Sequence, residues 1–519
     1  MNIRTARLVA MMSTVLPLSG CLVGPDYHRP PPASPPAAQY KELPGWTAAA
    51  PADAAPKGDW WTDFHDPLLD QLEPMVQVSN QTVRADYENY QQALALVQEA
   101  NAQLFPTIGA TGSVSRSRGG GGGIGGGIST SSIGGGTGTS TTTGISTGGS
   151  SRSSHIVASS GSVEATLTWD LDLWGKIRRT IEENADNAQS SEATLANATL
   201  SEQVLLATTL INLRTTDANI DLLTKTVEEY KESLRVVSNA VKAGYNLYPP
   251  SDEITARVLL ENTQASLIAL GVVRAQYVHA LAVLVGKNPE ELDIPHSTAM
   301  PVLPQIPVGV PSTLLQRRPD IAAAERTMAA QNAAVGVAIS AYYPDISLSA
   351  SDGFAQTPLS GLLKAANNVW SVGAAGTETI FDFGAREAEV NAAKAAYRSA
   401  VATYRGTVLS AFQGVEDNLA GLRILAAQAQ VLDAAVRDAT RGAQIARNEY
   451  QAGTVDYTTV ATAEATQLSD EENALTVQQS RLTDAATLIG DLGGGWSDAQ
   501  LHDAQHPDAP VQDEAIQGR

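Results

Sequence analysis

The sequence has 519 residues, with 55 acidic and 34 basic side chains, and carries a formal net charge of −21. This acidic excess gives no reason to expect nucleic acid binding, and the single cysteine, Cys21, excludes an intrachain disulfide. The length fits two or three domains, although an internal duplication gives one long domain the length of several.

The first 21 residues resemble a bacterial lipoprotein signal. Arg4 and Arg7 precede an apolar run that ends in Leu18-Ser19-Gly20-Cys21. This pattern predicts a signal peptide over residues 1–20, with a diacylglycerol and an N-acyl lipid on Cys21 as the lipid anchor. The alternative is an ordinary signal peptide followed by an incidental cysteine.

Residues 21–59 are predicted to form a lipidated N-terminal tether. They are rich in Pro and Ala between positions 25 and 56, which is typical of an extended segment without a core. Leu22 rather than an aspartate follows the cysteine, which by resemblance to the bacterial lipoprotein sorting rule favours the outer membrane.

A helix is predicted from the Asp66-Pro67 turn to Phe105-Pro106, preceded by three aromatic residues. We expect these aromatics to pack rather than to bind a ligand. They are Trp60, Trp61 and Phe64.

Strict alternation of apolar and polar residues over positions 162–173 predicts a strand with one apolar and one polar face. Its length and pattern are typical of a membrane barrel strand, with Trp169 and Trp174 in an interfacial aromatic girdle, although a sheet on a soluble core alternates likewise. No apolar run after the N-terminus has the length of a membrane helix, so we expect any membrane crossing to use strands.

The segment 118–154 before this strand is almost wholly Gly, Ser and Thr. It lacks the Gly-Lys-Ser/Thr ending of a phosphate-binding loop, so a flexible loop at one mouth of a barrel is predicted.

Two long helices are predicted, from Gly175 to Gly244 and from Gly384 to Gly453, because an apolar residue recurs every seventh position in both. An offset of 209 places the heptads of the first on those of the second. A ring of helices and a long dimeric coiled coil both fit this periodicity. The aligned pairs are Leu206 with Val415, Leu213 with Leu422, Ile220 with Ala429 and Val227 with Val436.

Shorter helices are predicted to return from each long helix, over Ser251–Val285 and up to Leu488-Ile489-Gly490, and a Pro-rich linker at 295–311 joins the halves. The second half repeats the order with a helix over Ser312–Tyr343 and strands near Asp345–Ala350 and Trp370–Ile380. We therefore predict a first structural repeat at 60–300, a second at 301–496 and a disordered acidic tail at 497–519.

His502 and His506 have the spacing of a metal pair but are expected to be solvated.

Five motifs together resemble the TolC-like outer membrane factors, and among them the NodT-like lipoprotein channels of resistance-nodulation-division (RND) tripartite efflux systems. They are Cys21-Leu-Val-Gly-Pro-Asp-Tyr27, Trp60-Trp61 to Leu69, Trp169 to Gly175, Leu314 to Ile321 with Ala324-Glu325, and Leu492-Gly-Gly-Gly-Trp496.

This resemblance implies an α+β membrane protein that assembles as a homotrimer. Four strands per chain would form a 12-stranded β-barrel in the outer membrane lipid, continuous with a long periplasmic α-helical barrel and a mixed equatorial domain. The implied partners are a periplasmic adaptor (membrane fusion) protein and an inner membrane RND-type pump. No cofactor is implied apart from the lipid on Cys21.

The resemblance also places functional residues at the turns below the long helices. Contacts with the adaptor are implied for Ala243, Gly244, Tyr245, Tyr450, Ala452, Gly453 and Thr454. The periplasmic aperture is implied for Asp252, Glu253, Asp456, Thr458, Thr459 and Thr462.

The aperture departs from the TolC-like pattern at four positions. Thr459 and Thr462 stand where relatives place acidic residues, and Val455 and Pro250 stand where an Arg–Asp link would be needed. A salt-bridged closed state that cations block strongly is therefore not expected. The hypothesis that remains is that Asp456, Asp252 or Glu464 lines the mouth.

The predicted function is a passive exit duct for drugs or other small molecules, gated at its periplasmic end. No nucleotide site, metal set or nucleophile–base pair is found in the sequence, so no enzyme activity is predicted. One alternative is the duct of a type I protein secretion system, against which the lipobox and Arg317-Arg318-Pro319-Asp320 count. The other is a structural coiled-coil lipoprotein that spans the periplasm.

Overall fold

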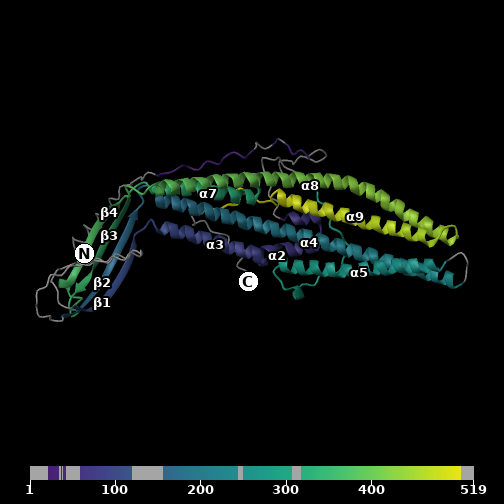
Figure 1. Cartoon of the computed structure of the whole chain (residues 1–519), viewed down its shortest axis with the longest axis horizontal. Helices are drawn as coiled ribbons and strands as arrows, with labels where there is room; N and C mark the ends of the chain where they lie inside the picture. Colours follow the sequence, from purple (N-terminus) through teal and green to yellow (C-terminus); the bar gives the residue numbers. More distant parts are fainter. Residues whose placement is uncertain are drawn as a thin grey trace. The chain divides into compact units, whose positions relative to one another are not determined.

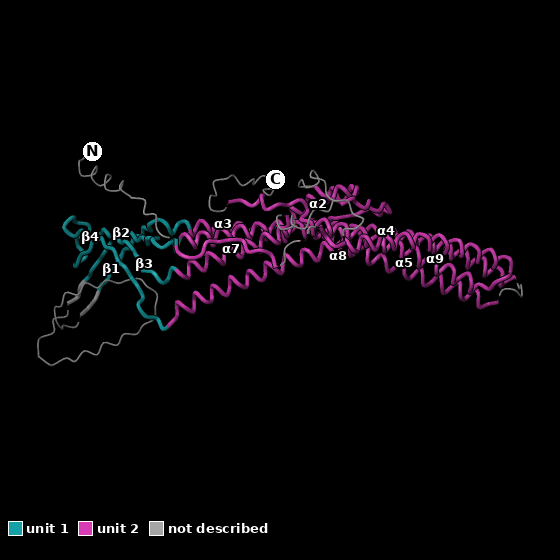
Figure 2. Tube along the Cα trace, turned by 90° about the horizontal axis from the view of Figure 1, so that it is seen from above, with its two compact units in different colours: residues 1–22, 101–177, 340–383 teal, residues 23–100, 178–339, 384–519 magenta. Residues whose placement is uncertain are grey.

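The computed structural model describes residues 22–33, 37, 39–42, 59–119, 156–243, 249–306 and 317–503. The predictions for Cys21, Gly244 and Tyr245, and for nearly all of the loop at 118–154, fall outside these residues. The chain divides into a strand unit, residues 1–22, 101–177 and 340–383, and a helical unit, residues 23–100, 178–339 and 384–519 (Figure 2).

The strand unit is one antiparallel sheet in the order β1-β2-β3-β4 (Figure 1). Leu167 lies opposite Ile108 on β1 and Ala350 on β3, so apolar residues of neighbouring strands share one face. The predicted alternating strand is confirmed and extends further toward its N-terminus than expected. The strands are β1 (Thr107–Gly119), β2 (Ile156–Leu171), β3 (Asp345–Gln356) and β4 (Asn368–Thr377).

The helical unit contains pairs of helices of equal length. The long pair has 67 residues each and starts at Lys176 and Ala385, 209 positions apart, which confirms both predicted long helices. The other two pairs have 35 and 22 residues per helix. The pairs are α4 (Lys176–Lys242) and α8 (Ala385–Gln451), α5 (Pro250–Leu284) and α9 (Tyr457–Asp491), and α3 (Gln81–Ala102) and α7 (Pro319–Ser340).

The helix predicted to run from Pro67 to Phe105 is instead broken into α2 (Pro67–Ser79) and α3 at Asn80. The Asn80 backbone is extended, and its side-chain oxygen accepts from the amides of Thr82 and Val83 at 2.8 and 3.2 Å. Its amide nitrogen donates to the carbonyl of Leu284 at 2.9 Å. Asn80 thus caps α3 and ties the break to the end of α5.

The main core of the helical unit lies where α2, α4, α5, α8 and α9 meet. The three aromatics before α2 are buried in it, and Trp60 makes edge-on contacts with Trp61 and Phe64, with ring centroids 6.0 and 6.2 Å apart. The prediction that these residues pack is confirmed. Leu206 and Val415, which the heptads align, are both fully buried in the same core.

Described parts of the predicted tether and of the predicted tail dock on the long helices. Tyr40, within the predicted tether, is buried, and the amides of Lys41 and Glu42 donate to the Glu416 carboxylate on α8. In the predicted disordered tail, the described residues reach 503, and His502 pairs with Glu192 on α4. Hydrogen bonds and ion pairs with the long helices hold both segments in place despite their polar composition.

We expected no apolar run of membrane-helix length after the N-terminus, but two helices reach that length and apolarity when hydropathy is averaged over 18 residues. The helices Pro250–Leu284 and Ala385–Gln451 each contain an 18-residue stretch that is apolar enough to cross a membrane, by length and composition alone. The sequence contains no unbroken apolar run there, because Ala, Val and Leu are mixed with Thr, Gly and a few charges. Most of each stretch is exposed in the single chain.

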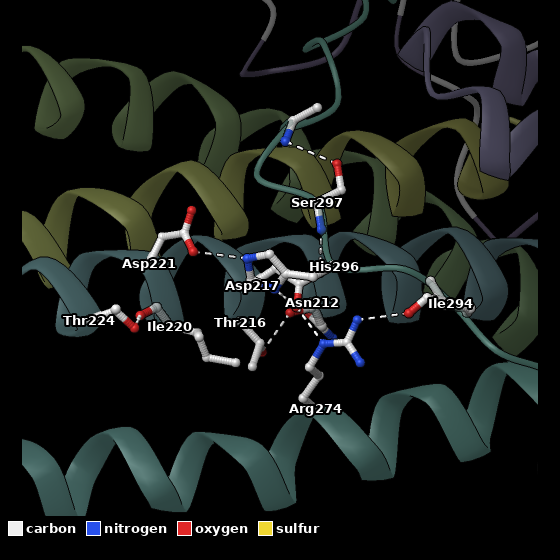
Figure 3. A network of polar contacts seen from close by, with 11 residues as sticks. Asn212, Thr216, Asp217, Ile220, Asp221, Thr224, Arg274, Ile294, His296 and Ser297 are labelled. Carbon is white, nitrogen blue, oxygen red and sulfur yellow. Dashed lines mark hydrogen bonds and ion pairs between the residues drawn. The ribbon is translucent and has the colours of Figure 1, made fainter.

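Buried charge fixes the linker after α5 to the middle of α4 (Figure 3). Asp217 is fully buried and accepts from the Arg274 guanidinium at 2.7 Å and from the Ser297 amide at 3.1 Å. The His296 ring lies between Asp217 and Asp221, with nitrogen–oxygen distances of 3.1 and 2.9 Å. Residues 294–297 at the start of the linker are therefore held against α4.

Candidate functional site

The turn between α8 and α9 follows from its local sequence. Gly453 adopts a left-handed backbone with φ of 73°, and its amide donates to the carbonyl of Tyr450, which ends α8. Asp456 then caps α9, because its carboxylate accepts from the amide and the hydroxyl of Thr459 at 3.2 and 3.0 Å. The Gly–Asp spacing therefore gives a tight hairpin tip.

Beside this turn, the ends of α4, α5, α8 and α9 share a small apolar core, which we call the tip cluster. The rings of Tyr450 and Tyr457 meet edge-on, 5.4 Å apart. This cluster is separate from the main core and joins the two hairpins at their ends. Its members are Val237, Ala256, Ala446, Tyr450, Tyr457 and Val460.

Two hydroxyl contacts link the hairpins within the tip cluster. The Tyr450 hydroxyl donates to Asp252 Oδ2 at 3.4 Å, and the Tyr457 and Ser233 hydroxyls lie 2.9 Å apart. Burial raises the pKa of Asp252, although the hydrogen bond from Tyr450 opposes this. Burial also raises the pKa of Tyr457 to about 12. Tyr457 is therefore neutral and available as a donor.

Arg447 on α8 bridges both hairpins at the same end of the helices. Its Nε lies 2.6 Å from Glu464 on α9, and its Nη2 lies 2.9 Å from Glu229 on α4. Glu464 is buried, and among the described residues its second oxygen has no hydrogen-bond partner. Burial raises the pKa of Glu464 despite the arginine. Removal of the arginine would therefore leave a buried carboxyl without its cation.

The predicted aperture residues fall into two groups. Asp252 is buried against Tyr450, so its carboxylate does not face solvent, and Glu253 is half-buried and pairs with Arg257 at 2.7 Å. The other four residues, on the first turns of α9, are exposed. They are Asp456, Thr458, Thr459 and Thr462.

The described residues predicted to touch an adaptor also divide by exposure. Tyr450 belongs to the tip cluster, Gly453 is half-buried, and Ala243, Ala452 and Thr454 are exposed.

Sequence reasoning missed Arg447, Glu229, Ser233 and Tyr457. Arg447 and Glu229 are 218 positions apart, and no motif marks either of them. Glu464 was proposed to line the mouth, but its side chain is buried beside Arg447. The sequence signal was a single glutamate, Glu464, among the Ala and Thr residues of α9.

The polar face of the strand unit carries paired hydroxyls. Serine or threonine side chains on neighbouring strands lie 2.7–3.0 Å apart at four places along this face. The opposite face is apolar and exposed, with Ile108, Trp370 and Val372 more than 70% accessible. The four pairs are Thr107–Thr168, Ser113–Ser162, Ser115–Ser160 and Ser351–Ser371.

Aromatic side chains gather near the ends of the strands. Phe105, Phe381 and Phe383 are exposed, and Trp174 stacks on Tyr343 with centroids 5.0 Å apart. The indole nitrogens of Trp169 and Trp174 donate to the carbonyls of Leu104 and Pro344, both at 2.9 Å. Exposed aromatics beside an apolar band are typical of the boundary between lipid and water.

In the part of the chain that the structure describes, no three His, Cys, Asp or Glu side chains are grouped so as to hold a metal ion. The tip cluster and the two-faced sheet are therefore the features from which a function can be argued.

Comparisons with known proteins identify the family of this chain. The sequence model of the outer membrane efflux protein family matches residues 74–287 and 310–494. The chain is 30% identical over 502 residues to the probable efflux pump outer membrane protein TtgC of Pseudomonas putida, covering 95% of this chain and 96% of TtgC.

Two solved structures extend the likeness to the fold. The outer-membrane channel OprN superposes with a TM-score of 0.80 at 27% identity, covering 92% of this chain and all of OprN. The open state of the Neisseria gonorrhoeae MtrE outer membrane channel superposes with a TM-score of 0.76 at 26% identity, covering 92% and 99%.

Proposed function

This chain belongs to the outer membrane efflux protein family and is the outer membrane channel of an efflux pump, and on that premise we propose how its parts form a gated exit duct. The observation that carries the proposal is the two-faced sheet with two open edges. One face is apolar and exposed, the other is lined with hydroxyls, and among the described residues no strand pairs with the outer edges of β1 and β4. Such a sheet suits a wall between lipid and a wet lumen.

A single copy does not complete this wall. Unpaired backbone groups on β1 and β4 would be exposed to lipid, where no water satisfies them. Three copies would join their edges into a 12-stranded barrel, and the exposed apolar stretches of α5 and α8 would then be covered by neighbouring helices. The equal lengths of α4 and α8 support an internal duplication within each copy.

The tip cluster supports a gate at the periplasmic end of the duct. Arg447, Tyr450 and Tyr457 on one hairpin all contact the other hairpin, and we propose that these contacts hold the closed arrangement. Opening would separate these contacts. The exposed residues of the turn would then be free to meet an adaptor.

The remaining parts of the proposal concern anchoring and partners. Cys21 would carry the acyl lipids in the outer membrane, while a periplasmic adaptor and an inner membrane RND-type pump would deliver substrates and energy. The chain itself would act without cofactor chemistry. Drugs or other small molecules would pass through passively, since a wide solvated lumen need not recognise them.

Planar bilayers test the duct directly. We expect the purified full-length protein to run as a trimer in mild detergent and to give single-channel openings. A monomer that leaves bilayers ion-tight would refute the barrel and would favour a structural coiled-coil lipoprotein.

Crosslinking in cells followed by purification tests the partners. We expect an adaptor and an RND-type pump to co-purify with the channel. Recovery of a peptide-exporting ATPase instead would assign the duct to type I protein secretion.

A further inference from the structure

A buried arginine holds the segment that follows Cys21 against the helical unit. Arg179, in the first turn of α4, is only 2% exposed. Its Nε donates to the carbonyl of Val23 at 3.2 Å, and its Nη2 lies 3.0 Å from the Asp26 carboxylate. Its Nη1 pairs with Glu182 at 2.7 Å. The guanidinium is thus paired on every side, and the pairing fixes the chain from Val23 to Asp26.

Three further contacts continue this docking along α7 and α8. The partners on α7 come earlier in the helix as the segment proceeds, so the segment runs antiparallel to α7. We call residues 23–29 with their contacts the N-terminal clamp. The contacts are Asn332 Nδ2 to the Pro25 carbonyl at 2.9 Å, the Tyr27 hydroxyl to Glu325 at 2.5 Å, and Arg29 Nε to the Tyr404 hydroxyl at 3.3 Å.

Two glycines give the segment room to approach. Gly24 has a φ of +106°, and a Cβ there would lie 2.5 Å from the Cα of Gly336 on α7. A Cβ on Gly336 would in turn lie 3.1 Å from the side chain of Arg179. The close crossing of segment and helix therefore requires glycine at position 24, and a side chain at position 336 would crowd the arginine.

We propose that Arg179 is a positioning residue for the lipid anchor, which it fixes at the first turn of α4. This inference rests on the proposed lipidation of Cys21. Two residues of chain connect Cys21 to the clamped Val23, which limits the separation of their Cα atoms to about 7 Å. Without the clamp, the next contact along the chain is that of Lys41 with Glu416, and the roughly 20 residues up to it would act as a tether with a root-mean-square span of about 25 Å.

The clamp matters because the span of the tether between lipid and protein determines the effective concentration of the protein beside the bilayer. The accessible volume scales as the cube of the span, so shortening the span from about 25 to about 7 Å concentrates the protein beside the bilayer roughly fiftyfold. The strands follow closely in the chain, since β2 ends at Leu171. The clamp would therefore favour insertion of the strands soon after the lipid has entered the membrane.

A pulse-chase experiment in cells tests this inference with the full-length chain, measuring the rate at which the heat-modifiable trimer forms. The variants are Arg179→Met, Cys21→Ser behind a cleavable secretory signal, and the two combined. We expect Arg179→Met to slow assembly about tenfold in the lipidated chain and to add no further slowing to Cys21→Ser. Arg235→Met is the matched control, because Arg235 lies exposed on α4 and pairs only with the neighbouring Glu232 in the contacts described.

Equal slowing by Arg179→Met in both backgrounds would show that the arginine only stabilises the fold, and would overturn the inference. Absence of slowing in the lipidated chain would also overturn it. If Arg179→Met does not fold, Asp26→Asn removes one partner of the clamp at an exposed side chain and should slow assembly in the same background-dependent way. Incorporation of labelled palmitate separates the two proposals, because an unlabelled parent chain would refute the lipidation itself.

Discussion

The Tyr450 hydroxyl lies 3.4 Å from the Asp252 carboxylate, and this contact joins the last turn of α8 to the first turn of α5. Both residues are buried, so the contact holds the hairpins together where water does not compete. The distance is near the upper limit of a hydrogen bond, and the link is therefore easily broken.

We expect Tyr450→Phe to raise the open population of the channel about fivefold. The ring would still pack on Tyr457, so only the hydroxyl is lost, at a cost of about 1 kcal/mol to the closed tip. Single-channel recording measures the change. Tyr397→Phe, on the same helix and away from the tip cluster, is the control. An unchanged open probability would show that this contact does not hold the gate.

Arg447→Gln should open the channel more strongly, because it leaves Glu464 buried without its cation. A loss of about 2 kcal/mol would raise the open population roughly thirtyfold. Arg437→Gln, at an exposed position of the same helix, should behave like the parent. The double variant Arg447→Gln/Glu464→Gln should recover part of the closed state. If the double variant does not recover the closed state, the pairing with Glu464 is not the reason why Arg447 favours closure.

Glu73→Gln tests a buried carboxyl in α2. Glu73 is fully buried, and among the described residues neither of its oxygens has a hydrogen-bond partner. Burial raises its pKa from 4.5 to about 9. Between pH 4.5 and 9 the folded chain keeps the Glu73 proton, whereas the unfolded chain has released it. The contribution of Glu73 to the free energy of unfolding is therefore greatest below pH 4.5 and falls as the pH rises toward 9.

The Gln variant lacks this ionisation. It should therefore become more stable than the parent by several kcal/mol as the pH is raised from 5 to 9. Thermal unfolding at several pH values measures the difference. Parallel curves for the two proteins would show that Glu73 ionises normally.

Leu167→Arg and the adjacent Thr166→Arg test the two faces of the sheet. Leu167 lies on the apolar face, opposite Ile108 and Ala350, and an arginine at mid-membrane there costs about 2–4 kcal/mol. Thr166 points to the hydroxyl-lined face, where an arginine stays hydrated. Only Leu167→Arg should therefore reduce the heat-resistant trimer on gels. Equal loss from both variants would contradict a lipid-facing apolar surface.

Periodic features of the fold could be predicted from the sequence. Leu206 and Val415 belong to heptads that align at an offset of 209, and they became buried positions of two helices of equal length. Alternation around Leu167 likewise predicted a two-faced strand. Such patterns are local, because the period of side chains along a helix or strand fixes which of them share a face.

Contacts between distant segments could not be predicted in this way. The bridge from Arg447 to Glu464 and Glu229 depends on how two hairpins pack, and the docking of residues 23–29 depends on Arg179, more than 150 positions away. The break at Asn80 could have been predicted from the sequence. Asparagine is a common helix cap, and α3 and α7, at 22 residues each, show the same helix in both halves.

The paired hydroxyls on the polar face of the sheet bear on how cargo travels. Ser113, Ser115 and Thr107 share hydrogen bonds with hydroxyls on the adjacent strand, so in each pair one hydroxyl donates to its neighbour and the other stays available to water. Such a surface is well hydrated, so a molecule moving past it would bind weakly. Its dwell time on the wall would be short. Discrimination among compounds would then have to occur upstream, before they reach the sheet.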